Sequence, residues 1–190
     1  MITSEIFRQK FEAGMSLAEH VSTAKPAQVD RWRAMIAKAC ISAPQRALVE
    51  SFTRKMNLLI VSGNWCGDCI EQLPLIQAIV DANPSRLALR IVDRDAHADF
   101  SARFTINGGA RGPVVLFLGE DFEWCATAGD RTLSRYRRIA EKQIGASCSL
   151  GAIVPPDDEL AAATADWLNE IERVQLMLRL SPRLRQKYGD

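Results

Sequence analysis

Two cysteines separated by two residues could carry thiol-disulfide chemistry. The stretch Trp65-Cys66-Gly67-Asp68-Cys69 follows the apolar run Leu58 to Val61 and opens a segment with helical spacing. A thiol at a helix N-terminus lies near unpaired backbone N–H groups and the positive end of the helix dipole, which stabilise its thiolate. We therefore expect Cys66 to be the catalytic nucleophile. Cys69, one helical turn deeper, would be the catalytic thiol that resolves a mixed disulfide.

A zinc half-site and two incidental core cysteines are the alternative interpretations of this spacing. A zinc site needs three or four protein ligands, which usually arrive as a second close pair. The other cysteines are single and far apart, and the two histidines form no H-x-x-x-H pair: Cys40, Cys125, Cys148, His20 and His97. The sequence therefore favours redox chemistry that needs no metal and no organic cofactor.

The composition is that of an ordinary soluble globular protein. Of 190 residues, 47% are hydrophobic and 25% charged, and 24 basic against 23 acidic residues leave a formal charge of +1. This balance gives no global field that would favour nucleic acid or a membrane as a partner. No apolar stretch reaches the ~18 residues of a membrane span, and the first residues lack the pattern of a secretory signal. We expect a cytoplasmic protein, in which a C-x-x-C is more often catalytic than structural.

Hydrophobic periodicity divides the chain into a helical start and an alternating middle. The first 55 residues predict three helical segments, separated near Gly14, Pro26 and Ser42. Buried strands are predicted at 56–62, 87–92 and 114–118, with a fourth at 122–126 closing a hairpin. Helices are predicted from Cys69 to 83, at 95–104, at 132–144 and at 157–180. The stretch 145–156 is the best linker candidate.

This order of elements resembles the thioredoxin family over residues 45–144. Trp65-Cys66-Gly67-Asp68-Cys69 is similar to the family's active-site motif, with Asp68 in place of the usual proline. Pro74 matches the proline that kinks the active-site helix, and Pro113 stands where the family has a cis-proline opposite the thiols. Gly129 falls where the family tends to have a glycine. The chain would then have an N-terminal helical extension at 1–44 and a linker with a C-terminal helical extension at 145–190.

The resemblance implies an α/β thioredoxin-like fold, a central mixed β-sheet flanked by helices, of a bacterial type. It implies a thiol-disulfide oxidoreductase that acts on protein or small-molecule disulfides and is reduced by an external dithiol or reductase. The substrate would meet the motif and the proline loop, and the backbone of Gly112 would pair with an extended peptide. The substrate-binding residues would be Trp65, Gly67, Asp68, Gly112 and Pro113.

The sequence also departs from the family. The strand before the motif holds Leu58 to Val61 and no carboxylate to accept the Cys69 proton, which must go elsewhere, with water and Asp68 as candidates. The family's first strand is replaced by helices, and Gly112 stands where a larger residue is usual. Asp68 and Glu71 should raise the pKa of Cys66 through their negative charge. These departures keep a rival open: a redox-inactive module that binds a partner through its added helices.

Several other residues have plainer interpretations. We expect His20, His97 and Arg111 to be surface or capping residues, and Cys40 and Cys125 to be small core residues. Cys148, between two serines, is the one plausible third redox thiol. The basic residues of the tail are expected to form a solvated helix face: Arg173, Arg179, Arg183, Arg185 and Lys187.

Overall fold

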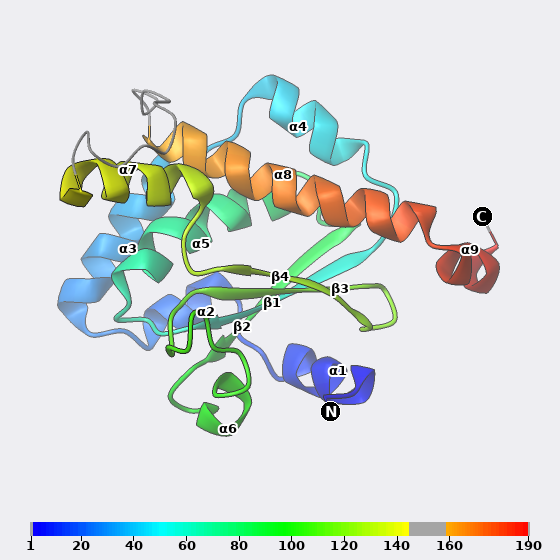
Figure 1. Cartoon of the computed structure of the whole chain (residues 1–190), viewed down its shortest axis with the longest axis horizontal. Coiled ribbons are helices and arrows are strands. Elements are labelled where there is room, and N and C mark those ends of the chain that lie inside the picture. Colours follow the sequence, from blue (N-terminus) through cyan, green and yellow to red (C-terminus); the bar gives the residue numbers. More distant parts are fainter. Residues whose placement is uncertain (1, 145–158, 190) are drawn as a thin grey trace.

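A mixed four-stranded sheet forms the centre of the molecule (Figure 1). The computed structural model describes residues 2–144 and 159–189. The strand order is β2-β1-β3-β4, with β2 parallel to β1, and β3 antiparallel to both β1 and β4. The strands are β1 (Met56–Ser62), β2 (Leu87–Asp93), β3 (Val114–Leu118) and β4 (Trp124–Gly129).

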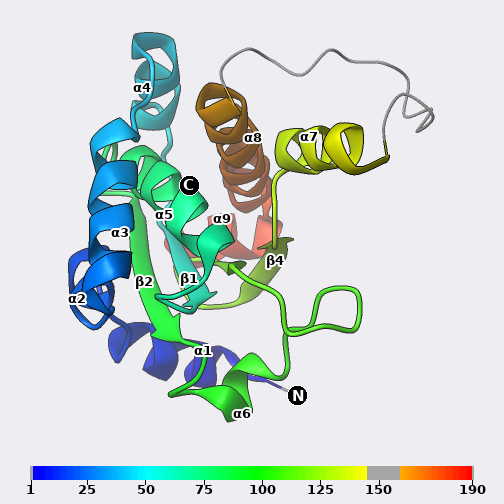
Figure 2. The same cartoon turned by 90° about the vertical axis from the view of Figure 1, so that its left-hand side faces the viewer.

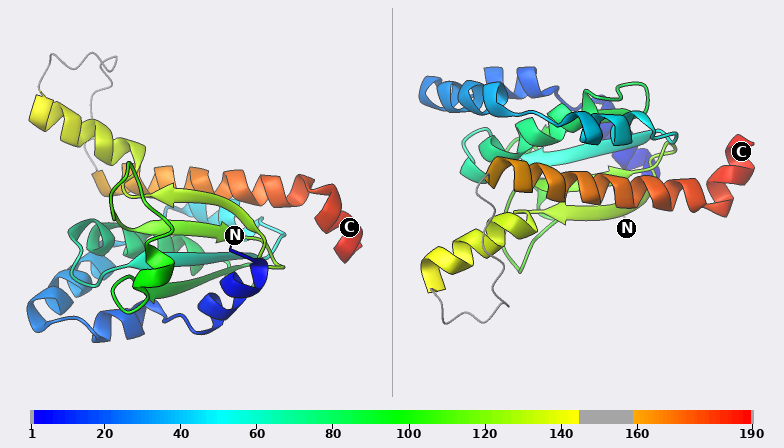
Figure 3. Two further views of the ribbon diagram at one scale, coloured as in Figure 1. Left: turned by 60° about the horizontal axis from the view of Figure 1, so that its bottom comes forward. Right: turned by 90° about the horizontal axis from the view of Figure 1, so that it is seen from above.

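Helices lie on both faces of this sheet and at its ends (Figures 2 and 3). The first four precede the sheet: α1 (Ser4–Glu12), α2 (Leu17–Ser22), α3 (Pro26–Lys38) and α4 (Ala43–Glu50). Two connect the strands: α5 (Gly67–Val80) and the short α6 (Ala98–Ser101). Three follow it: α7 (Leu133–Ile144), α8 (Glu159–Leu180) and α9 (Pro182–Tyr188). This is the predicted fold class, a mixed sheet flanked by helices with extra helices at both termini.

The alternation of side chains along the strands separates two hydrophobic cores. Leu58 and Ile60 of β1 face the larger core, in which α3, α5 and α8 pack on the sheet through Trp32, Leu73 and Trp167. On the other face, Leu59 and Val61 lie in a second core with Phe7 of α1, Phe100 of α6 and Phe104, which follows α6. A one-residue shift of β1 would exchange the two faces, so burial on both sides fixes its register.

Helices replace the edge strand that would continue the sheet beyond β2. Between α1 and α2, Met15 alone pairs with Ile91, exchanging two backbone hydrogen bonds of 2.8 Å. Gly14 allows the chain to approach this closely, because a Cβ there would lie 2.9 Å from the Cβ of Arg90. The N-terminal region therefore holds four helices where the sequence predicts three segments, because Met15 interrupts the first.

Most other boundaries agree with the sequence. β1 and β3 have the predicted limits, whereas β4 begins at Trp124 because the turn includes Phe122 at a positive φ of 64°. α6 is shorter than predicted, and α9 was not anticipated; Ser181 caps it and Pro182 occupies its first turn. The linker candidate at 145–156 and Cys148 lie outside the described residues.

The long helix α8 is tied to the helix that carries the cysteines. The indole Nε1 of Trp167 donates to Oε1 of Gln72 on α5 at 3.2 Å, and Nε2 of Gln72 donates to the carbonyl of Asp130 at 2.6 Å. All three residues are buried. Gln72 therefore joins α5, α8 and the segment that follows β4 through a pair of hydrogen bonds in a low-dielectric interior. In neither described range is a helix both long and apolar enough to cross a membrane.

Candidate active site

The two motif cysteines lie at the carboxyl end of β1, where the chain turns into α5. Cys66 is the N-cap residue of α5, and its Sγ accepts the backbone N–H of Cys69 at 3.4 Å. As a thiol, Cys66 also donates to the carbonyl of Gly112 at 3.6 Å. Cys66 is half-buried, Cys69 is fully buried, and both are free thiols. Pro74 lies inside α5, one turn beyond Cys69.

The surroundings separate the pKa values of the two thiols. Hydrogen bonding from the Cys69 thiol, together with the N–H groups of Cys69 and Asp68, outweighs burial and lowers the pKa of Cys66 to about 7. The charge of Asp68 raises that pKa, as the sequence predicts, but does not prevail. The pKa of Cys69 is raised well above its ordinary value, first by its contact with Cys66 and then by burial. One thiol is thus ready to react at neutral pH while the other holds its proton.

Arginines form ion pairs with the acidic residues in and just after the motif. Asp68 forms a 2.8 Å ion pair with Arg131, which follows β4, and Glu71 forms one of 2.8 Å with Arg135 on α7. The sequence predicts that Asp68 and Glu71 add negative potential near Cys66, and these partners reduce it. The carboxylate of Asp68, one of the two acceptors that the sequence suggests for the Cys69 proton, is thus engaged by Arg131.

The proline loop packs against the thiols as the resemblance implies. The Gly112-Pro113 bond is cis, Pro113 is buried, and a Cβ at Gly112 would lie 3.5 Å from Sγ of Cys69. Gly129 lies beside this loop at φ +130°, and a Cβ there would fall 2.1 Å from the carbonyl oxygen of Pro113. Only glycine fits at that position.

Trp65 and Gly67 complete the rim beside the cysteines. The Trp65 side chain is 48% exposed, and its Nε1 donates to Asp95 at 2.9 Å while Arg94 stacks over the ring. The loop before the motif is also held from below, because the buried Trp32 of α3 donates to the carbonyl of Asn64 at 2.9 Å. The structure thus brings together all seven residues that the sequence nominates for the site: Trp65, Cys66, Gly67, Asp68, Cys69, Gly112 and Pro113.

Two residues beneath Cys69 were missed by the sequence analysis. Ser62, the last residue of β1, and His20 of α2 are both completely buried. The prediction that His20 is exposed or a cap is wrong, because α2 packs against the sheet and turns this face inward. A single histidine in a short helix carries no signal of this placement. Only the polar Ser62, ending an otherwise apolar strand, could have drawn attention to the position.

Other predictions for single residues also need correction. Cys40 is exposed, since it follows the end of α3 instead of lying on its buried face. Cys125 is half-buried on β4, and burial raises its pKa. Arg183 and Lys187 are not simply solvated, because both bind Asp121 in the turn before β4. Arg111, by contrast, is exposed as predicted, and it pairs with the buried Asp130 at 3.4 Å.

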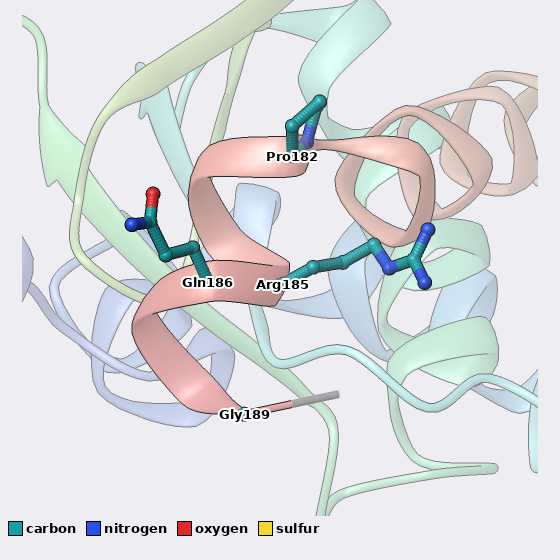
Figure 4. A pocket seen from close by; sticks show the side chains of 4 residues that line it. All are labelled: Pro182, Arg185, Gln186 and Gly189. Atoms are coloured by element: carbon teal, nitrogen blue, oxygen red, sulfur yellow. The ribbon is translucent and has the colours of Figure 1, made fainter.

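Two cavities among the described residues are lined by neither motif cysteine. One of about 500 Å³ borders α9 and is lined by Pro182, Arg185, Gln186 and Gly189 (Figure 4). In Figure 1, α9 lies at the end of the sheet away from α7. Another, of about 460 Å³, lies between β4 and α8 and includes Arg131 and Leu133. Over residues 2–144 and 159–189, no three His, Cys, Asp or Glu side chains gather closely enough to hold a metal ion.

Comparisons with known proteins agree with this fold. The chain is similar over 92% of its length to a crystal structure of a protein of unknown function from Pseudomonas aeruginosa, with a TM-score of 0.69, 20% identity and 99% of that chain covered. An HIV epitope scaffold matches with a TM-score of 0.66 and 20% identity over 87% of this chain and 97% of its own. No curated protein matches the chain in sequence.

The family comparison includes the motif, the proline loop and three of the N-terminal helices. A family model described as Thioredoxin matches residues 14–135, well over half of the chain. That range begins at the Met15 segment and ends within α7, so it contains the sheet and every site residue named above. The chain belongs to the thioredoxin family.

Proposed function

We propose that this protein is a thiol-disulfide oxidoreductase that reduces or exchanges disulfides through Cys66 and Cys69. The observation that carries the proposal is the placement of a half-buried Cys66, with a pKa of about 7, above a fully buried Cys69 whose pKa is raised. About half of Cys66 is then thiolate at neutral pH, compared with a few per cent of a free cysteine.

In the reductive direction, the Cys66 thiolate attacks one sulfur of a substrate disulfide. The second substrate sulfur leaves as a thiolate and takes a proton from water. Cys69 then loses its proton and attacks Sγ of Cys66, which releases the first substrate sulfur as a thiolate that is also protonated. Two electrons pass from the dithiol to the substrate, and a Cys66–Cys69 disulfide remains for an external dithiol or reductase to reduce.

The substrate would dock on the surface formed by Trp65, Gly67, Asp68 and the Gly112-Pro113 loop. An extended substrate backbone could pair with Gly112, while the exposed Trp65 ring offers an apolar contact. We extend to the protein the remaining expectations from its sequence: a cytoplasmic location, substrates that are protein or small-molecule disulfides, and no resident cofactor. The bacterial type is proposed on the sequence resemblance.

The experiment compares wild type with each single cysteine variant on a small disulfide-bonded protein, with dithiothreitol as the reductant. Wild type should accelerate reduction, and Cys69→Ser should accumulate a mixed disulfide with the substrate that is visible on a non-reducing gel. Cys66→Ser should do neither. If Cys66→Ser traps substrate instead, the roles of the two thiols are reversed. If wild type does not accelerate reduction, the proposal fails.

A second candidate function is a redox-inactive module that binds a protein partner. Exposed apolar side chains on α8 favour it, since Leu176, Met177 and Leu180 are 51, 42 and 73% exposed. An alkylation titration separates the candidates. A Cys66 pKa near 7 supports the enzyme, whereas the value of an ordinary cysteine, about 8.5, supports the module.

A further inference from the structure

A short chain of buried polar side chains leads away from Cys69. The Ser62 hydroxyl is oriented toward the sulfur of Cys69, and its hydrogen bonding lowers the pKa of Cys69 against the larger opposing effects of Cys66 and burial. On its other side, Oγ of Ser62 lies 3.2 Å from Nε2 of His20. The three residues come from different elements, α5, β1 and α2, so their meeting depends on the tertiary fold. This arrangement occupies the position below the resolving thiol, where the strand offers no carboxylate.

Burial of the polar side chain of His20 in the core is energetically unfavourable. Its side chain is 0% exposed, and its Nδ1 has no hydrogen-bond partner among the residues that the structure describes. Leaving a buried polar atom unpaired is unfavourable, because the atom loses its hydrogen bonds to water and gains none in the protein. The ring meets the Trp32 ring edge-on, with centroids 5.8 Å apart, which an apolar side chain could do equally well. Packing alone therefore does not explain a histidine at this position.

The surroundings of His20 keep its imidazole neutral, so one ring nitrogen is free to accept a proton. Burial lowers the pKa of His20, and the carboxylate of Asp93 on β2 opposes this effect. The imidazole is therefore neutral at pH 7. The ring of His20 contacts the uncharged Trp32 of α3 and Ser62 of β1. The titratable group of α5 near Ser62 is Cys69. Asp93 also accepts the N–H groups of Asp95 and Ala96, so it supports a positive charge on His20 without binding the ring directly.

We propose that Ser62 and His20 form the proton relay of the resolving step, with Ser62 contacting the reacting thiol and His20 acting through it. The proposal rests on the function proposed above. As Cys69 attacks Sγ of Cys66, the Cys69 proton passes to Oγ of Ser62 and the Ser62 proton passes to Nε2 of His20. The Cys66–Cys69 bond forms, and the bond from Cys66 to the substrate sulfur breaks. The departing thiolate takes a proton from water, and His20 then gives its proton to water and becomes neutral again.

The test uses a dithiobis-nitrobenzoate probe, which reports the two steps separately. Attack by Cys66 releases one coloured thiolate, and attack by Cys69 on the mixed disulfide releases the second. The full chain carries Cys40→Ser, Cys125→Ser and Cys148→Ser, so that only the two motif thiols react. In this background we expect the second release to change little between pH 7 and 9, because the relay supplies the base.

Ser62→Ala and His20→Gln should slow the second release by about 100-fold at pH 7, the lower end of the usual general-base contribution of roughly 10²–10⁴-fold. Glutamine keeps a hydrogen-bonding group near Ser62 but cannot take up the proton. In both variants the rate should recover as pH rises, because hydroxide replaces the relay. Ser62→Thr, which keeps the hydroxyl, should restore most of the rate. The matched control is Ser101→Ala, which removes another buried hydroxyl without a partner in the described structure.

The outcomes separate the relay from the proposed function. If neither Ser62→Ala nor His20→Gln slows the second release by more than about twofold, the relay is overturned while the oxidoreductase stands. A slowing that is equal at every pH also overturns it, because a purely structural defect would not be rescued by hydroxide. If His20→Gln does not fold, Ser62→Ala and a slower second release in heavy water decide the question. If the background protein never releases the second thiolate, the proposed function itself fails.

Discussion

The two ends of the sheet bring together different groups: ion pairs that hold the C-terminal helices at one end, and the two thiols at the other. At the end away from the thiols, Arg54 is 2.9 Å from Glu120, Asp121 binds Arg183 and Lys187, and Asn57 donates to the carbonyl of Gly119 at 3.1 Å. At the thiol end, Cys66 and Cys69 are free thiols and Nδ1 of His20 lacks a partner in the described structure. The paired end anchors α8 and α9, whereas the thiol end keeps groups available for proton and electron transfer.

The largest expected difference between the two ends concerns activity. Cys66→Ser should reduce disulfide reduction by about 10³-fold or more, because it removes the nucleophile. Cys125→Ser, beside the turn at the paired end, should leave the rate within about twofold, since burial raises the pKa of that thiol and disfavours its thiolate. The measurement is steady-state reduction of a model protein disulfide. Comparable losses of the reduction rate in both variants would contradict a functional difference between the two ends of the sheet.

The next difference concerns the stability of two glycine positions. Gly129→Ala, beside the proline loop, should lower the free energy of unfolding by about 2–4 kcal/mol, because the new Cβ would meet the Pro113 carbonyl at φ +130°. Gly119→Ala, at the paired end, should cost about 1 kcal/mol, since its Cβ would lie 3.1 Å from a side-chain oxygen of Asp121. Denaturant unfolding measures both values. A larger loss at Gly119 would contradict the comparison.

A smaller effect should appear as acid sensitivity of the paired end. Burial raises the pKa of Asp121, but hydrogen bonds and charge from Arg183 and Lys187 prevail and lower it to about 2. Because the folded-state pKa lies below the unfolded one, the stabilisation is present above about pH 4 and is lost as pH falls toward 2. Asp121→Asn should remove about 1 kcal/mol at pH 7 and flatten this dependence. Unfolding curves from pH 7 to 2 test it, with Asp99→Asn on α6 as a control that should retain the wild-type slope.

The smallest effect should be on the Cys66 thiolate. Asp68→Asn should lower the Cys66 pKa by a few tenths of a unit, and Arg131→Ala should raise it by a similar amount, because the two charges oppose each other 2.8 Å apart. Alkylation rates as a function of pH give both values. Shifts of the same sign in the two variants would rule out this electrostatic account.

The fold and the two thiols were readable from the sequence because their signals are local. The apolar run of β1 is long enough to be a covered strand, and the cysteines follow it at a fixed spacing. The cis bond before Pro113 and the packing of Gly129 agree with the family resemblance. Each of these features is determined by a short segment or by a single residue type, so the sequence alone can predict it.

The relay and the ion pairs were not readable because they join distant segments. His20 and Ser62 are 42 residues apart, and Arg131 lies 63 residues beyond Asp68. No spacing rule links such residues, since their contact depends on how helices pack on a finished sheet. The position of Met15 was hidden for a related reason: one residue paired at a sheet edge has no periodicity to detect.

The hydrogen bonds of Gln72 have a consequence for the order in which the chain is made. During synthesis, β1 and α5 leave the ribosome long before Trp167, which donates to Gln72 from α8. Until α8 arrives, the side of α5 that it covers stays open to water, along with the apolar faces that meet Ile171 and Val174. Cys66 and Cys69 therefore leave the ribosome early, but the helix that carries them is fully packed only after α8 has been made. A nascent chain stalled before residue 167 should expose its thiols to oxidation more than the finished protein does.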